Sequence, residues 1–162
     1  MHIQSKKRAF SLVELVIVVV IIGVIAAIAV PRISRGARGA NESALRADLA
    51  ALRNAIDLFA AEHGGSFPLA GTFETQLTTF SDDAGNTNAT KTTVFKYGPY
   101  LRAIPGLPVA GAGAITGGKL GDKTVAASDA AGVGWIYTVS SGTIVANTGT
   151  AAAEDGTLYN AF

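Results

Sequence analysis

An uninterrupted apolar segment near the N-terminus constrains this chain more than any other feature. Residues 12–30 read LVELVIVVVIIGVIAAIAV, in which Glu14 is the one ionisable side chain. A helix over residues 10–31 would be about 33 Å long at about 1.5 Å per residue, enough to cross a hydrocarbon layer of about 30 Å. Apolar residues occupy all of its sides, which disfavours a helix lying on a membrane surface. The segment predicts a membrane-spanning helix, and a buried core helix and a secretory signal are the alternatives.

The composition of the 162-residue chain fits one small domain attached to this segment. Charged residues make up 15% of the chain, against about 25% in an average soluble domain, while 49% is hydrophobic. The 13 basic and 12 acidic residues give a net charge of +1, so the chain lacks the basic excess of a nucleic-acid-binding protein. The absence of cysteine excludes disulfides, thiolate metal sites and thiol catalysis.

Basic residues flank the apolar segment on both sides. Three of them precede it and three follow it: Lys6, Lys7, Arg8, Arg32, Arg35 and Arg38. Because the two groups are equal in number, charge alone does not choose the orientation of the segment in a membrane. A secretory signal would be cut near the small residues at 26–29, but its apolar run would exceed the usual length of about 7 to 15 residues.

The junction before the apolar segment, KKRAFSLVEL at residues 6–15, resembles the N-terminal signature of type IV prepilins and type II secretion pseudopilins. The shared features are a short basic leader, a small residue before Phe10, a carboxylate at Glu14 and a proline at Pro31. The resemblance implies that a prepilin peptidase cuts between Ala9 and Phe10 and methylates the new amino group of Phe10. Ala9 stands where the family usually has Gly.

Glu14 is informative on physical grounds as well. A carboxylate within the hydrocarbon costs about 2.5 to 3.5 kcal/mol on insertion scales, so Glu14 should find a partner or reach the membrane surface. After cleavage, the amino group of Phe10 would lie one helical turn away, on the same helix or on a neighbouring subunit. The resemblance implies that Glu14 and Phe10 of adjacent subunits form an assembly charge pair. Pro31 lacks a backbone N–H and predicts a helix kink.

Residues 32–63 continue in helical period and predict an amphipathic extension of the same helix. Apolar residues form one stripe, at Leu45, Leu49, Leu52, Ile56 and Phe59. Charged residues lie on the other side, at Arg46, Asp48, Arg53, Asp57 and Glu62. Gly64 and Gly65 predict the helix end. The arginines at 32, 35 and 38 share one side of the helix, where they would contact phospholipid headgroups or pair with Glu42 or Asp48 of a neighbouring subunit.

Residues 64–162 predict a small globular domain. Residues 134–139 and 143–147 alternate in polarity around a Ser-Ser-Gly turn and predict a hairpin, and residues 92–97 predict a further strand. The Gly- and Ala-rich residues 109–134 predict a variable loop. Residues 54–68, 98–105 and 134–139 are similar to segments of major pseudopilins. The predicted fold class is α+β, a pilin-like fold with the long N-terminal helix packed on a small antiparallel β-sheet.

Chemistry-bearing residues are sparse. His2 and His63 are the only histidines, and no hydrolase, P-loop, zinc-protease or dinucleotide-binding motif occurs, so we expect no enzyme. Acidic residues are candidate calcium ligands at Asp82, Asp83, Asp122, Asp129, Glu154 and Asp155. No dense acidic loop is present, so solvated carboxylates are favoured and the metal is left unknown. No other cofactor is expected.

These observations predict a filament subunit with four parts: a removed leader at 1–9, a transmembrane and filament-core helix at 10–31, its amphipathic continuation at 32–63, and a globular domain at 64–162. The resemblance implies a single-pass inner-membrane protein whose C-terminal domain faces the periplasm until assembly extracts it. Expected partners are a prepilin peptidase, identical subunits in a helical homopolymer, minor pseudopilins and an inner-membrane assembly platform. A type II secretion pseudopilus is favoured, with a type IV pilin and a membrane-anchored or secreted binding domain as alternatives.

Overall fold

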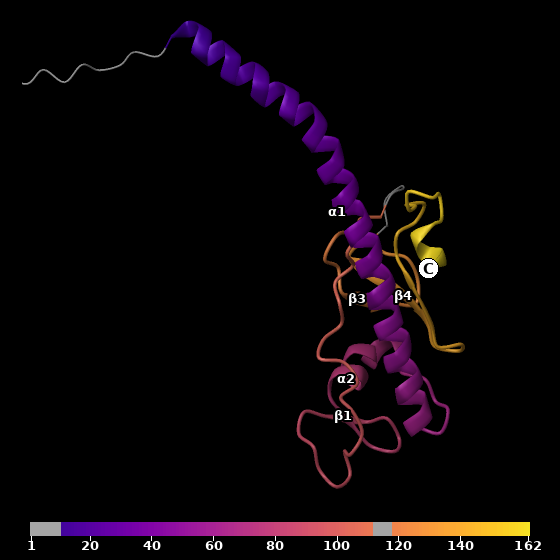
Figure 1. Ribbon diagram of the computed structural model, residues 1–162. Helices are drawn as coiled ribbons and strands as arrows, with labels where there is room; N and C mark the ends of the chain where they lie inside the picture. The colour runs from indigo at the N-terminus through magenta and orange to yellow at the C-terminus, as the bar shows by residue number, and fades with distance from the viewer. Residues whose placement is uncertain (1–10, 112–117) are drawn as a thin grey trace, which may run out of the picture. The chain divides into compact units, whose positions relative to one another are not determined.

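The computed structural model describes residues 11–111 and 118–162 of the chain (Figure 1). The chain divides into two compact units, residues 1–40 and 41–162, and each is considered by itself. One long helix, α1 at Leu12–Glu62, contributes to both units. The described part of the first unit is α1 with the residue that precedes it, whereas the second unit holds all of the strands and the short helices.

Both ends of α1 follow from local sequence. The carbonyl of Ser11 accepts a hydrogen bond from the backbone N–H of Leu15 at 3.2 Å, which sets the first turn. At the other end, Gly64 and Gly65 have φ values of 62° and 87°, which residues with a side chain rarely adopt. The N–H of Gly65 reaches back to the carbonyl of Ala60 at 2.7 Å and closes the helix. The predicted helix end at this glycine pair is confirmed.

In the second unit, residues 41–62 of α1 carry the stripe that the sequence predicted. Its five apolar members are at most 1% exposed: Leu45, Leu49, Leu52, Ile56 and Phe59. Along the same helix Arg46, Asp57 and Glu62 are exposed, while Asp48 and Arg53 are half-buried. Burial raises the pKa of the Asp48 carboxyl above its ordinary value. The amphipathic division of this half of the helix is confirmed.

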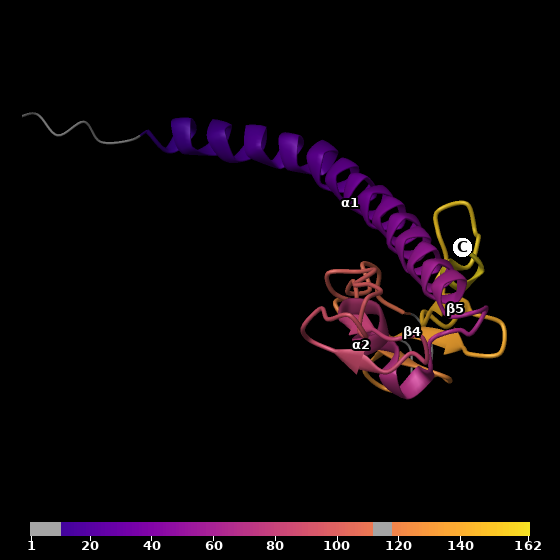
Figure 2. The same cartoon turned by 90° about the horizontal axis from the view of Figure 1, so that it is seen from below.

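Two small sheets complete the second unit. Strands β1 (Phe80–Ser81) and β2 (Thr87–Asn88) form an antiparallel pair. Strands β3 (Thr124–Ala126), β4 (Val133–Thr138) and β5 (Thr143–Ala146) form a second sheet in the order β3-β4-β5. Figure 2 labels β4 and β5 of this sheet. The short helices are η1 (Ala70–Thr72), α2 (Phe73–Thr78) and η2 (Tyr159–Ala161). The fold class is therefore α+β, as predicted, and is consistent with a pilin-like fold.

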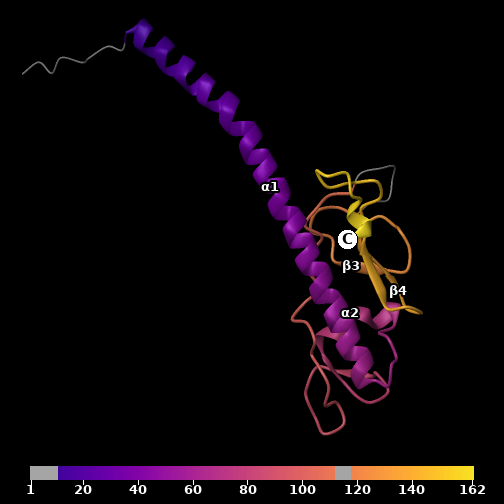
Figure 3. The same ribbon diagram turned by 45° about the vertical axis from the view of Figure 1, so that its right-hand side comes forward.

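The pairing within the three-stranded sheet is mixed. Strands β4 and β5 form the predicted antiparallel hairpin, with Trp135 opposite Ala146 and Thr138 opposite Thr143. Strand β3 instead runs parallel to β4 (Figure 3). The expectation of a purely antiparallel sheet is wrong for this pair. Parallel neighbours need a connection that returns to the starting end, and residues 127–132 supply it because β3 is only three residues long.

The core of the second unit joins the hairpin to segments distant in sequence. The indole Nε1 of Trp135 donates to the carbonyl of Pro105 at 2.9 Å, and the hydroxyl of Tyr137 donates to the carbonyl of Pro68 at 3.1 Å. Both side chains are fully buried, and burial raises the pKa of the Tyr137 hydroxyl to about 12. Each polar tip therefore keeps a partner inside the core, which avoids the cost of an unsatisfied buried donor.

One predicted strand and one predicted loop of the second unit were wrong. Residues 92–97 form no strand beyond a single bridge between Tyr97 and Ser81. The hydroxyl of Thr92 accepts hydrogen bonds from the N–H groups of Val94 and Phe95 at 3.2 and 3.0 Å, and this local turn competes with an extended strand. The expected loop at 109–134 contains β3, while its residues 112–117 lie outside the described structure.

Gly134 lies within β4 where the chain of another segment approaches closely. A Cβ atom at Gly134 would lie 2.1 Å from the carbonyl oxygen of Asp122, a distance that no side chain could occupy without moving the backbone. The position therefore requires glycine for close backbone packing. Gly71 in η1 offers a matched comparison, because a Cβ atom there would meet nothing within 4 Å.

We predict that Gly134→Ala destabilises the second unit by about 1 to 3 kcal/mol, the usual cost of overpacking a core. Gly71→Ala should change the free energy of unfolding by no more than about 0.5 kcal/mol. Chemical denaturation of both full-length variants in detergent, followed by circular dichroism, checks this. Equal stability of the two variants would contradict the close approach.

Candidate functional site

The apolar segment of α1 exposes its side chains within the first unit. From residue 12 to residue 30 the large apolar side chains are between 46% exposed, at Val16, and 77% exposed, at Leu12. By length and composition, α1 is the one described helix that could cross a membrane, and its most apolar window is not buried within the chain. A surface of this kind needs lipid or another protein to remove it from water.

Glu14 lies in the first turn of α1 and is exposed. A carboxylate at this end of a helix is favoured by the partial positive charge of the free backbone N–H groups. Among the described residues, Glu14 takes part in no ion pair. Ala9 and Phe10, the predicted cleavage pair and methylation site, lie outside the described residues. Cleavage, methylation and the pairing of Glu14 with Phe10 therefore stay predictions.

The helix continues through position 31, where the sequence predicted a kink. Residue 31 is helical in its backbone, but its side chain is not among those described, so the kink at Pro31 stays a prediction. Beyond it, Arg32, Arg35 and Arg38 are exposed. In the second unit Glu42, one of their two predicted partners on a neighbouring subunit, is 9% exposed and accepts a hydrogen bond from the Tyr159 hydroxyl at 3.1 Å. Pairing of Glu42 with a neighbour would therefore have to reach a side chain that is buried and already holds one internal hydrogen bond.

The candidate calcium ligands are engaged locally rather than with one another. The Asp82 carboxylate accepts hydrogen bonds from the backbone N–H groups of Ala84 and Asn86 at 2.9 Å each, and from the Asn86 side chain at 2.9 Å. The Asn86 side-chain bond is the main reason that the pKa of Asp82 is lowered. Asp122 accepts from the N–H of Lys119 at 2.7 Å. Within residues 11–111 and 118–162, no three potential metal ligands gather at one place.

The end of α1 carries a cluster that the sequence did not reveal. His63 is 7% exposed, its ring stacks on Phe59 with a centroid distance of 3.9 Å, and its Nδ1 lies 2.7 Å from the Phe59 carbonyl. Tyr97 meets the His63 ring edge-on at 5.2 Å, and its hydroxyl donates to Asp83 at 2.8 Å. These contacts join the helix end to Tyr97, which follows β2, and through it to Asp83 in the loop between β1 and β2. The sequence signal was weak, since His63 is adjacent to the helix-ending glycines and resembles a surface cap.

Asp83 is the charged centre of that loop. The hydroxyl of Tyr97 is the main reason that the pKa of the Asp83 carboxyl is lowered, and the hydrogen bond from Lys96 lowers it further. The Lys96 ammonium lies 3.0 Å from the Asp83 carboxylate, and this is the only ion pair among the described residues. The pair raises the pKa of Lys96. The ion pair and the hydrogen bond from Tyr97 hold this loop in place.

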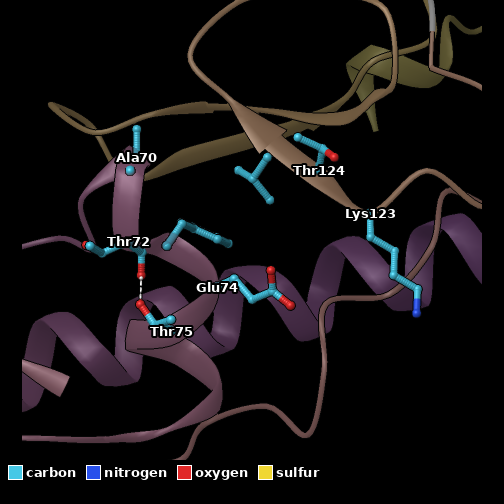
Figure 4. Close-up of a pocket in the computed structure, with 9 residues that line it drawn as sticks. Ala70, Thr72, Glu74, Thr75, Lys123 and Thr124 are labelled. Atoms are coloured by element: carbon cyan, nitrogen blue, oxygen red, sulfur yellow. Dashed lines mark hydrogen bonds between the residues drawn. The ribbon is translucent and has the colours of Figure 1, made fainter. Parts of the chain in front are cut away.

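A pocket of about 290 Å³ lies between the start of α2 and strand β3 (Figure 4). Glu74 in α2 and Lys123, which directly precedes β3, line it together with Thr72, Thr75 and Thr124. The hydroxyl of Thr75 donates to the carbonyl of Thr72 at 2.9 Å, a local turn contact. Most of the lining side chains are exposed, so the pocket is an open surface feature.

Comparison with known proteins identifies the N-terminal segment. The family model described as the prokaryotic N-terminal methylation motif matches residues 4–30, which include Glu14 and the apolar run. The chain therefore carries a prepilin-type methylation motif, as the resemblance at residues 6–15 predicted. The motif supports placement of the chain among type IV pilin-like and pseudopilin subunits, a structural class and not an enzyme family. No curated protein and no solved structure matches the chain.

We predict that Asp83→Asn removes a pH-dependent part of the stability of the second unit. A carboxyl whose pKa is lowered by folding stabilises the folded state above its ordinary pKa of 3.8, and this contribution is lost as the pH falls through the lower folded value. Differential scanning calorimetry of the full chain between pH 7 and pH 2 should show wild type melting above the variant at pH 7 and the difference shrinking in acid. Asp57→Asn, an exposed change on α1, is the control. A difference in melting temperature between wild type and Asp83→Asn that is the same at pH 2 as at pH 7 would contradict the lowered pKa of Asp83.

Proposed function

We propose that this chain is the structural subunit of a helical filament of the pilus or pseudopilus type. The methylation motif at residues 4–30 carries the proposal. The long uncovered apolar surface of residues 12–30 and the α+β second unit support it. The leader at 1–9 is removed, residues 10–31 first span the inner membrane and then join the filament core, and the second unit faces the periplasm. Subunits related by a rotation and a translation that do not close form an open helical polymer.

The charge chemistry of the segment gives a mechanism for ordered assembly. Glu14 is the one ionisable group between residues 12 and 30, and an unpaired carboxylate in hydrocarbon is costly. The methylated amino group of Phe10 on an adjacent subunit would neutralise it and set the axial register of the two helices. The apolar side chains supply contact area without a preferred register, so the charge pair decides which position is favoured. The partners are a prepilin peptidase, identical subunits, minor subunits and a membrane assembly platform.

Within this class we favour the pseudopilus of a type II secretion system. The similarity of residues 54–68, 98–105 and 134–139 to major pseudopilins supports this choice, as does the lack of cysteine, since many type IV pilins carry a C-terminal cysteine pair. Deletion of the gene should abolish secretion of folded proteins and leave surface motility and DNA uptake unchanged. The opposite pattern would assign the chain to a type IV pilus.

We predict that the mature chain begins at Phe10 with a methylated amino group. N-terminal sequencing and intact-mass measurement after co-expression with a prepilin peptidase check this. When Ala9 is replaced by a bulky residue, the chain should no longer be cut before Phe10, because the peptidase requires a small side chain at position 9. Ala9→Gly should be cut at least as well as wild type. A mature chain that starts after Ala29, or an uncut Met1, would defeat the proposal in favour of an ordinary signal or anchor.

We predict that Glu14→Leu leaves membrane insertion intact and reduces filament yield by at least tenfold. The variant keeps the apolar length of the helix but loses the charge that pairs with Phe10. Carbonate extraction measures insertion, and shearing with electron microscopy measures filaments. Glu74→Leu, which removes an exposed carboxylate from α2, is the matched control and should assemble normally. Normal filaments from Glu14→Leu would refute the charge pair.

A further inference from the structure

Two tripeptides in the chain have the Asn-X-Ser/Thr pattern that accepts N-linked glycans. They are Asn41-Glu42-Ser43 in α1 and Asn88-Ala89-Thr90 at the end of β2. Neither lies in the assembly segment, that is, in residues 10–31, which are proposed to join the filament core. Their structural settings differ, and the difference shows which of the two a transferase could use.

The tripeptide at Asn88 is exposed to solvent. Asn88, Ala89 and Thr90 are all exposed, and the loop that follows is exposed through Val94. The side-chain oxygen of Asn88 accepts the backbone N–H of Thr90 at 2.8 Å, which folds the tripeptide into an Asx-turn. Among the described residues, none accepts a hydrogen bond from the Asn88 amide nitrogen. The side-chain nitrogen of Asn88, which would react, therefore donates no hydrogen bond among the described residues. The hydrogen bond from the Thr90 N–H to the Asn88 side-chain oxygen holds the tripeptide in a turn.

The tripeptide at Asn41 is held in a regular helix. It lies inside the regular helix α1, so a transferase would have to unwind several backbone hydrogen bonds to draw it out. Its middle residue, Glu42, is 9% exposed and is held by the Tyr159 hydroxyl at 3.1 Å. Extraction would therefore also break a buried hydrogen bond of the second unit, which a transferase acting on Asn88 would leave in place.

We infer that Asn88 is the acceptor of an N-linked glycan supplied by a glycosyl diphosphate donor, either lipid-linked or nucleotide-linked. In the transfer, the Asn88 amide nitrogen forms a bond to C1 of the donor sugar, and the bond from C1 to the phosphate oxygen breaks with its electron pair on the phosphate. The amide gives up one proton, and no oxidant is needed. The access of Asn88 to a lipid-linked donor outside the cytoplasm rests on the proposed export of the second unit.

Tryptic digestion separates the two tripeptides, which makes the inference testable on one sample. Cleavage after Arg38 and Arg46 places Asn41 in the peptide 39–46, and cleavage after Arg53 and Lys91 places Asn88 in the peptide 54–91. The full chain in detergent is treated in two reactions, one with an oligosaccharyltransferase and a polyprenyl-diphosphate oligosaccharide, the other with a soluble N-glycosyltransferase and UDP-glucose. Mass spectrometry then locates the added sugar.

We predict that modification falls on peptide 54–91 and is at least tenfold lower on peptide 39–46. Asn88→Gln and Thr90→Ala should abolish it, Thr90→Ser should retain it, and Asn41→Gln should have no effect. Modification in only one reaction supports the inference and identifies the donor as lipid-linked or nucleotide-linked. A wild-type chain unmodified in both reactions, or modified equally at Asn41, would overturn it.

The same measurement on filaments purified from the native cell completes the test. A glycan on peptide 54–91 supports the inference, and an unmodified peptide in assembled filaments overturns it. Asn88→Gln should leave processing at Phe10 and filament yield unchanged, because Asn88 is an exposed residue outside the assembly segment. A failure of glycosylation is therefore distinguishable from a failure of filament assembly, which the Glu14→Leu variant reports.

Discussion

The apolar surface of residues 12–30 must be removed from water, and the rest of the proposed behaviour depends on this requirement. Burying one Val, Leu or Ile side chain contributes about 1.5 to 3 kcal/mol, and the segment is made almost entirely of such residues. Lipid and a bundle of identical helices cover that surface about equally well, because both are hydrocarbon to the side chains. They differ at Glu14, for which a neighbouring subunit can provide a cation and lipid tails cannot. In the proposed assembly, one carboxylate therefore gives direction to a transfer that the apolar residues leave nearly balanced.

The parts of the structure that the sequence predicted well are those with a strong period or a strong stop signal. The stripe from Leu45 to Phe59 repeats at helical spacing and is buried as expected, and Gly64 and Gly65 end α1 because they adopt positive φ. The β4–β5 hairpin was predictable from alternation around Ser-Ser-Gly. The methylation motif was predictable for a different reason: an enzyme reads a short linear pattern, so no tertiary structure is needed to see it.

The parts that the sequence did not predict depend on contacts between distant segments. Strand β3 has only three residues inside a Gly- and Ala-rich stretch, and it becomes a strand because β4 offers a parallel edge. Thr92 has a residue type common in strands, but its hydroxyl closes a local turn instead. Likewise the acidic residues of the loops were candidate metal ligands by residue type alone, whereas in the structure Asp82 accepts hydrogen bonds from the backbone N–H groups of Ala84 and Asn86, and Asp83 accepts one from the Tyr97 hydroxyl.

Trp135 gives the chain an internal optical probe. It is the only tryptophan, it is fully buried, and its indole nitrogen is bound to the Pro105 carbonyl. Residues 12–40 contain no tryptophan or tyrosine, so fluorescence excited at the red edge of absorption comes from the core of the second unit alone. The emission should be blue-shifted while that unit is folded, whether the chain is in bilayer, detergent or fibre. A red shift would then report unfolding of the second unit in the presence of lipid, without any attached dye.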